Sequence, residues 1–207
     1  MRSMVISLGM VAAIAGLAVG AATGAVITFE GLTTESPVPA GYAGLTWGTS
    51  SLDAVPGTTG YWQVRNDSSY ATPASPVNYV NNAYGPDQLW FSFPGPTFFN
   101  GAWFAPAFAL PDARATQVRF TDDLGHISPW LDLTPAPQYL AANFPGATTV
   151  YVERRGGTDN ALFGKARWYT MDDVTYGQCD VPEAGSLVLA ITGGLPLAGL
   201  VIRRNRS

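Results

Sequence analysis

The chain has 207 residues, and its 15 acidic and 11 basic side chains give a formal net charge of -4 at pH 7. Residues 26–180 are more acidic still, because 14 acidic and 7 basic residues give them a net charge of -7. This balance argues against nucleic acid or anionic lipid as the main partner. Cys179 is the only cysteine, which excludes an intramolecular disulfide, so a hydrophobic core must stabilise the fold.

The N-terminus has the three parts of a secretory signal peptide. Arg2 supplies a positive charge, residues 5–19 form an apolar run, and small residues follow as far as Ala25. We expect cleavage after Ala22 or Ala25, so the signal peptide spans residues 1–25 and the remainder of the chain is exported.

Residues 26–176 have the pattern of an all-β domain. Short runs rich in β-branched and aromatic residues are separated by Gly, Pro, Asn and Asp. Asp122-Asp123-Leu124-Gly125 is typical of a hairpin turn. About ten short strands in one domain predict a single β-sandwich or jelly roll. The predicted strands are Val26–Leu32, Gly44–Trp47, Gly60–Arg65, Gln88–Phe93, Phe98–Phe104, Thr116–Thr121, Ile127–Leu133, Gln138–Phe144, Thr148–Glu153 and Arg167–Tyr176.

Three segments of this domain resemble recurring signatures of exported bacterial jelly-roll domains. They are Phe29-Glu30-Gly31-Leu32, residues 41–47 and residues 169–176. The resemblance implies a jelly-roll fold. Because many members of that group are carbohydrate-binding modules, it also implies carbohydrate binding as an expectation.

Three carboxylates suggest a calcium site that joins the two ends of the domain. Glu30 lies in the first predicted strand, and Asp172 and Asp173 lie in the last. The first and last strands of a jelly roll often lie side by side, and Ca²⁺ prefers six to eight hard oxygen ligands. The alternative is that one aspartate binds backbone amides in a corner of the fold while the other is solvated.

The aromatic residues suggest a ligand surface. Six tryptophans and nine tyrosines are many for a domain of this size, and most are expected in the core. Tyr61, Trp62 and Tyr79 have polar neighbours that could bind sugar hydroxyls. We therefore predict them as a candidate carbohydrate-stacking surface.

Enzyme chemistry has weaker support in the sequence. His126 is the only histidine and is predicted in a surface turn, and the chain has no Gly-x-Ser-x-Gly elbow, His-rich metal motif or Gly-rich phosphate loop. A glycosidase needs two carboxylates flanking one cleft. The candidates for such an acidic pair are Glu30, Glu35, Glu153, Asp122, Asp123 and Asp132.

The C-terminus has the layout of a membrane sorting signal. Residues 177–183 form a predicted stalk that ends in the motif Val181, Pro182 and Glu183. Residues 184–202 carry no charge and would span about 28 Å as a helix, close to the thickness of a bilayer core. The tail, residues 203–207, is expected to stay cytoplasmic because of its membrane-stop arginines Arg203, Arg204 and Arg206.

The motif, the Gly-rich apolar span and the arginine tail together resemble the PEP-CTERM sorting signal of Gram-negative bacteria that make exopolysaccharide. Ala184 stands where that signal has a second proline. The resemblance implies that the chain is the substrate of an exosortase, a membrane transpeptidase-like cysteine enzyme that cuts near the motif. The protein would then pass from a transient inner-membrane anchor to the cell surface or the extracellular matrix.

Together these features predict a non-enzymatic exported protein of the cell surface or exopolysaccharide matrix. Its expected partners are an exosortase-type enzyme, the inner membrane for a short time, and extracellular polysaccharide, with no nucleic acid. Two alternatives stay open: a polysaccharide hydrolase or lyase that uses an acidic pair, and a purely structural matrix protein.

Overall fold

The computed structural model describes residues 24–107, 114–157 and 167–177. Within them the chain forms strands, a 3₁₀ turn (Tyr42–Gly44) and no α-helix, which confirms the all-β prediction. The strands are β1 (Ala25–Ile27), β2 (Thr46–Trp47), β3 (Thr49–Ser50), β4 (Gly60–Arg65), β5 (Tyr79–Ala83), β6 (Gln88–Pro106), β7 (Gln117–Asp122), β8 (Leu131–Asp132), β9 (Gln138–Arg155) and β10 (Tyr169–Tyr176).

The predicted sorting elements fall outside the described residues. The signal peptide lies almost wholly in residues 1–23, and the sorting motif Val181 to Glu183, the membrane helix and the terminal arginines lie in residues 178–207. Among the described residues, no helix is long and apolar enough to cross a bilayer. These elements therefore stay predictions.

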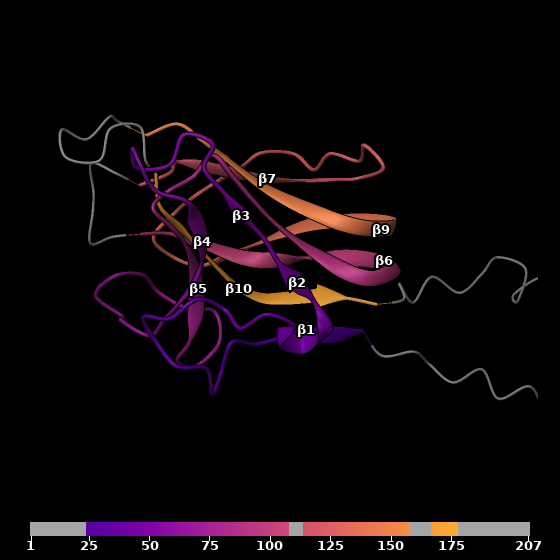
Figure 1. Cartoon of the computed structure of the whole chain (residues 1–207), viewed down its shortest axis with the longest axis horizontal. Coiled ribbons are helices and arrows are strands. Elements are labelled where there is room, and N and C mark those ends of the chain that lie inside the picture. Colours follow the sequence, from indigo (N-terminus) through magenta and orange to yellow (C-terminus); the bar gives the residue numbers. More distant parts are fainter. Residues whose placement is uncertain (1–23, 108–113, 158–166, 178–207) are drawn as a thin grey trace, which may run out of the picture.

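The strands form one antiparallel sheet that folds over a common core, consistent with a β-sandwich. The order along the sheet is β3-β4-β5-β10-β6-β9-β7-β8, with β1 on β10 and β2 on β6. The first and last strands pair directly, with Ala25 opposite Tyr176 and Ile27 opposite Val174, as the sequence predicts (Figure 1). This pairing brings the two ends of the domain together.

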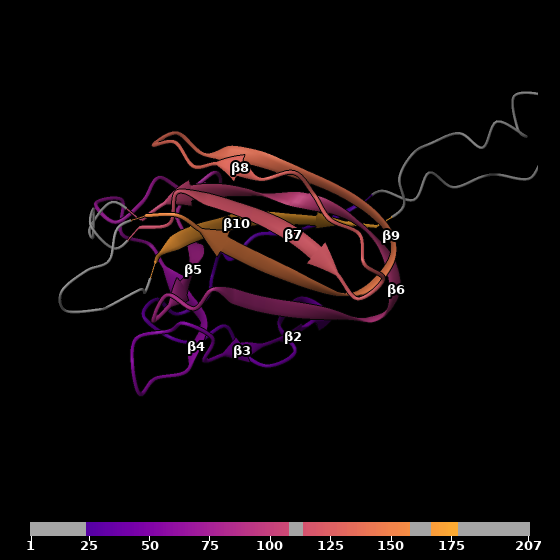
Figure 2. The same ribbon diagram turned by 90° about the horizontal axis from the view of Figure 1, so that it is seen from above.

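Two long strands connect the two halves of the sheet. The first half of β6 pairs with the second half of β9, and its second half pairs with the start of β9. The register shifts between Ser92 and Gly101, where β6 contains Pro94 and Pro96. Proline cannot donate a ladder hydrogen bond, so the ribbon bends there. Figure 2 shows β6 and β9 turning together at one end of the molecule.

The structure corrects the predicted strand list at several places. Each long strand was expected as two short strands, because prolines and glycines at the bends resemble turns. The predicted strand 127–133 is reduced to β8, while β5 is a strand that the polar residues around Asn81 and Asn82 conceal. The hairpin turn at residues 122–125 is confirmed, because the N–H of Gly125 donates to the carbonyl of Asp122 at 3.2 Å.

The core lies between the inward faces of the strands. β7 alternates strictly, so Val118 and Phe120 are buried while Gln117, Arg119 and Thr121 point outward. Phe120 packs edge-on against Phe99 with ring centroids 4.7 Å apart. Large aromatic side chains bury much apolar area each, which stabilises a domain without disulfides. The same alternation leaves a continuous outer face of polar and aromatic residues.

Candidate functional site

The carboxylate cluster, which we define as Glu30, Asp172 and Asp173, lies where β10 approaches the segment 74–78. Asp172 is only 3% exposed. Its Oδ2 accepts the N–H groups of Ala74 at 2.9 Å and Ser75 at 2.8 Å, and its Oδ1 accepts the N–H of Asp173 at 2.9 Å. One carboxylate thus satisfies three backbone donors.

Glu30 holds the other end of the same segment. Its Oε1 accepts the N–H groups of Val77 and Asn78, both at 2.9 Å. The hydroxyl of Ser75 lies between the two carboxylates, at 3.4 Å from Glu30 Oε1 and 3.0 Å from Asp172 Oδ2. The cluster therefore fixes a loop that has no ladder hydrogen bonds of its own.

Burial is the largest influence on the pKa values of Asp172 and Asp173. Loss of solvent raises the pKa of Asp172 to about 6, and the nearby charge of Asp173 acts in the same direction, against the hydrogen bonds from Ser75. Burial and the charge of Glu30 also raise the pKa of Asp173. Keeping the Asp172 carboxylate ionised at neutral pH therefore lowers the stability of the folded protein.

These residues do not fit a calcium ion well. No group of three or more His, Cys, Asp or Glu side chains within the described ranges is disposed to hold a metal. The oxygens that face the 74–78 segment already accept N–H groups, and Ca²⁺ would need several of them. The arrangement resembles the predicted alternative, in which an aspartate binds backbone amides. Calcium at this position stays a prediction that chelation can test.

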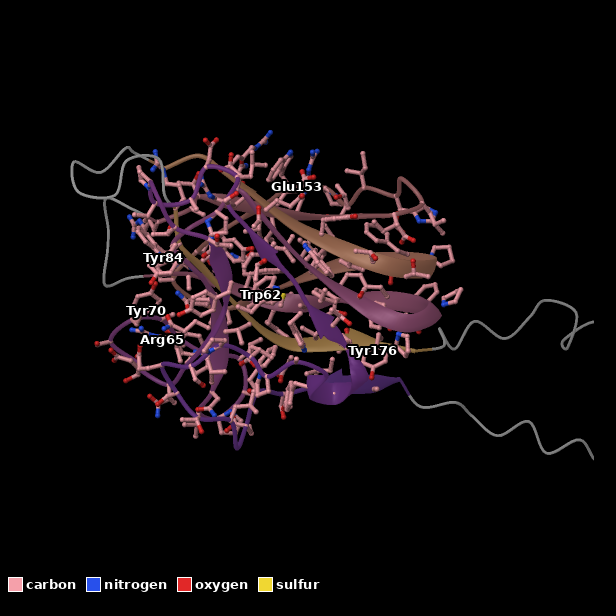
Figure 3. All side chains as sticks on the ribbon, in the orientation of Figure 1. Trp62, Arg65, Tyr70, Tyr84, Glu153 and Tyr176 are labelled. Atoms are coloured by element: carbon pink, nitrogen blue, oxygen red, sulfur yellow. The ribbon has the colours of Figure 1, made fainter. Side chains whose placement is uncertain are left out.

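Two of the three aromatic residues predicted to bind a ligand lie in the interior. Trp62 and Tyr79 are each 1% exposed, and Figure 3 places Trp62 in the middle of the fold. The indole N–H of Trp62 donates to the carbonyl of Trp90 at 3.0 Å. Only Tyr61 is partly exposed, and its ring packs edge-on against Tyr84. The alternation in β4 thus turns Trp62 inward and Tyr61 outward, so Trp62 and Tyr79 cannot offer ring faces to a sugar.

The outer side of three neighbouring strands offers a different site. We call it the β6–β9–β7 face and define it by the rows Gln88–Glu153–Arg119 and Trp90–Tyr151–Thr121, together with Gln117, Trp130 and Arg155. The strand register places the members of each row opposite one another. All of the row residues are partly exposed. Figure 3 shows Glu153 near one edge of the molecule.

Glu153 is the centre of a hydrogen-bonded network on this face. Its Oε2 accepts both Nε and Nη2 of Arg119 at 2.7 Å. Its Oε1 accepts the hydroxyl of Thr121 at 3.2 Å and the amide of Gln88 at 3.3 Å. The network fixes side chains from three strands without burying them fully.

Trp130, just before β8, extends the face at its edge. The guanidinium of Arg119 lies 4.5 Å from the indole centroid and that of Arg155 lies 4.1 Å from it. Such cation–π contacts contribute about 0.5–1 kcal/mol each at exposed sites and hold the ring in place. Arg155 also donates from Nε to Gln117 Oε1 at 2.5 Å. The result is a set of partly exposed rings and hydrogen-bonding groups.

The other predicted acidic residues have structural partners. Asp122 accepts the N–H groups of Leu124 and His126, and its Oδ2 lies 2.7 Å from His126 Nδ1. The His126 ring in turn stacks on Phe144. These contacts close the hairpin turn.

Comparison of the chain with protein-family models and with curated proteins found no match in either case. The fold and the site therefore carry the functional argument. They define an all-β domain with a sandwich-like core, a carboxylate cluster around the buried Asp172 and a polar aromatic outer face.

The sequence contains a signal for the β6–β9–β7 face, although it is a weak one. Residues 117–121 and 149–153 alternate between apolar and more polar types. That alternation predicts which side chains share a side of each strand. It does not predict that β9 lies between β6 and β7, which is what assembles the face.

Proposed function

We propose that this chain is an exported, non-enzymatic jelly-roll protein of the cell surface or exopolysaccharide matrix that binds polysaccharide through the β6–β9–β7 face. The observation that carries the proposal is the position of Trp90 opposite Tyr151 in the strand register, one row away from the Glu153 network, with Gly48 lying against the Trp90 indole on one side. Aromatic rings offer flat apolar surface, while nearby polar groups orient a ligand. A sugar presents the matching combination of an apolar ring face and hydroxyls.

The jelly-roll assignment rests on two features of the topology. β1 and β10 are paired, and the bent β6–β9 ribbon contributes to both halves of the sheet. Sandwich folds have many functions, so the fold supports an exported binding domain without specifying its ligand.

The destination of the protein rests on the two ends of the chain. The signal peptide would direct export, and the PEP-CTERM-like tail would hold the protein in the inner membrane until an exosortase cuts near Pro182 and Glu183. The acidic balance of the exported part suits a soluble matrix protein better than one that binds anionic lipid.

A glycan array with the exported protein tests the function. The proposal expects retention on at least one polysaccharide, with no release of shorter products on prolonged incubation. Product release that a single carboxylate substitution abolishes would instead support a hydrolase or lyase. An array without binding would support a purely structural protein.

A further inference from the structure

We infer that the polysaccharide is acidic, and that its carboxylate binds in an arginine-lined pocket at the end of the β6–β9–β7 face. The inference rests on the proposed function and adds the class of ligand. The pocket has a volume of 270 Å³ and includes Arg154, Arg155 and Arg167, with Asp53 and Asp87 on its wall. Pockets that hold drug-sized ligands have volumes of about 300–1,000 Å³, and this volume is slightly smaller, so the pocket suits one charged sugar residue.

The arginines are concentrated at this end of the domain, although the exported part is acidic overall. The described residues contain six arginines, and five of them come from the start of β7, the end of β9 and the start of the last segment. Those five are Arg114, Arg119, Arg154, Arg155 and Arg167. Arg119 and Arg154 pair with Glu153 and Asp87, and Asp53 lies at the same end, so the five arginines exceed these three carboxylates by two. A local excess of positive charge in an acidic protein favours an anionic partner for that region.

Two arginines have different roles in the pocket. Arg154 is buried and forms an ion pair with Asp87 at 2.7 Å, and its Nη2 donates to the carbonyl of Gly85 at 2.8 Å. Its charge is therefore neutralised, and it positions the pocket wall. Arg155 is exposed, lines the pocket and contacts Trp130 at the same time. Arg155 thus connects the pocket to the aromatic face.

Gly157, two residues after the end of β9, allows the backbone to pass close to two arginines at the pocket. Gly157 has φ +90°, a conformation that other residues rarely adopt. A Cβ atom at this position would lie 2.3 Å from the carbonyl oxygen of Arg114 and 2.7 Å from Cδ of Arg167. Only glycine lets these two arginines and the backbone approach so closely.

Carboxylate is the anion that this geometry favours. A guanidinium is planar and matches a carboxylate with two parallel hydrogen bonds. Three arginines against two aspartates leave the lining with an excess of one positive charge. A sugar ring on the β6–β9–β7 face would then place an acidic substituent, or an adjacent uronic acid, at Arg155.

Titration calorimetry of the exported protein with two polyuronates, polygalacturonate and alginate, tests this inference. Carboxyl-reduced polygalacturonate serves as the neutral arm and dextran sulfate as the sulfate arm. We expect Arg155→Gln to weaken polyuronate binding about tenfold, the loss expected for one charged hydrogen-bonding pair. Arg155 also contacts Trp130 on the binding face, so binding of the neutral polymer reports the loss of that contact alone and should weaken less than binding of polyuronate.

Arg65→Gln is the matched control. Arg65 also contacts an aromatic ring, that of Tyr70 at 4.4 Å, and pairs with Glu35 at 2.8 Å, but it lies away from Glu153 (Figure 3). The Arg65→Gln substitution removes the same charge as Arg155→Gln. An equal loss of polyuronate affinity in both variants would therefore show that only the net charge of the protein matters, and would overturn the inference.

Binding of the neutral polymer as tight as that of both polyuronates would overturn the inference too, while leaving the proposed function intact. Tighter binding of dextran sulfate than of the polyuronates would contradict the inference of a carboxylate ligand and identify sulfate as the preferred anion. Binding of no polymer would contradict both proposals.

Discussion

The carboxylate cluster and the β6–β9–β7 face use the same residue types for different purposes. In the carboxylate cluster, Asp172 and Glu30 accept backbone N–H groups from one loop. On the face, Glu153 accepts side-chain donors from Arg119, Thr121 and Gln88. Asp172 is buried, whereas Glu30 and Glu153 are both partly exposed. The first arrangement holds a loop in place, and the second orders side chains on the outer surface.

The hydrogen-bonding partner of an acidic residue, rather than its carboxylate, therefore decides whether that residue stabilises the fold or orders a surface. A buried carboxylate that satisfies backbone donors contributes to folding, because removing it leaves those donors unpaired. A partly exposed carboxylate paired with arginine contributes little to stability but orders a surface. Substitutions in the two regions should therefore change different measured quantities.

The largest effect is expected for Asp172→Ala. It removes a buried acceptor that three backbone N–H groups share, those of Ala74, Ser75 and Asp173. We expect the free energy of unfolding to fall by about 2–4 kcal/mol, measured by urea denaturation.

Asp123→Ala is a matched control for that prediction. Asp123 also accepts two backbone N–H groups, those of Thr148 at 3.0 Å and Thr149 at 2.9 Å, but it is exposed. Water can replace it, so we expect a loss of about 1 kcal/mol or less. Equal losses in the two variants would show that burial does not distinguish the carboxylate cluster.

The second largest effect concerns pH. The pKa of Asp172 is raised from 3.8 to about 6, so between these values the folded protein binds more protons than the unfolded chain. Stability contributed by this group is therefore full below pH 4 and is lost as pH rises towards 6, by at most about 3 kcal/mol. The lowered pKa values of the exposed Asp67 and Asp123 act in the opposite direction at lower pH. Urea denaturation at a series of pH values measures the sum.

Asp172→Asn isolates the contribution of Asp172 to that pH dependence. The amide cannot titrate, so the difference in unfolding free energy between wild type and variant should change between pH 4 and pH 6. A difference that stays constant over this interval would contradict the raised pKa.

A smaller effect is expected for the ion pair on the face. Arg119 and Glu153 are partly exposed, so a double-mutant cycle with Arg119→Ala and Glu153→Ala should give a coupling of about 0.5–1 kcal/mol. Urea denaturation of the four proteins supplies the cycle. A coupling above about 2 kcal/mol would place this pair in the same energetic class as the buried cluster.

The smallest effect is expected for metal removal. If N–H donors alone satisfy Glu30 and Asp172, adding EDTA should leave the melting temperature of the protein unchanged. A lower melting temperature that added Ca²⁺ restores would instead establish the calcium ion that the sequence predicts.

The sequence predicts the local parts of this fold well. The alternation around Val118 and Phe120, the turn at Gly125 and the pairing of the first and last strands all follow from residue pattern and fold class. The bends in β6 and β9 do not, because a proline inside a continuous strand has the same local pattern as a proline in a loop.

The candidate site was harder to predict for a related reason. Alternation says that Tyr61 and Trp62 face opposite sides of β4, but it does not say which side is the core. Two of the three backbone donors to Asp172, those of Ala74 and Ser75, lie 98 and 97 positions away in the chain, and nothing local to Asp172 indicates them. Glu153 likewise acquires its role from residues on two other strands.

The central claim is that the β6–β9–β7 face binds polysaccharide, and one pair of variants tests it most directly. Trp130→Ala removes a ring from the face, whereas Trp103→Ala removes a ring that is 36% exposed and packs against Tyr139 elsewhere on β6 and β9. Calorimetry with a polysaccharide retained on the array should give at least about a tenfold loss of affinity for Trp130→Ala and no change for Trp103→Ala. Unchanged affinity in Trp130→Ala, or an equal loss in both variants, would contradict the account.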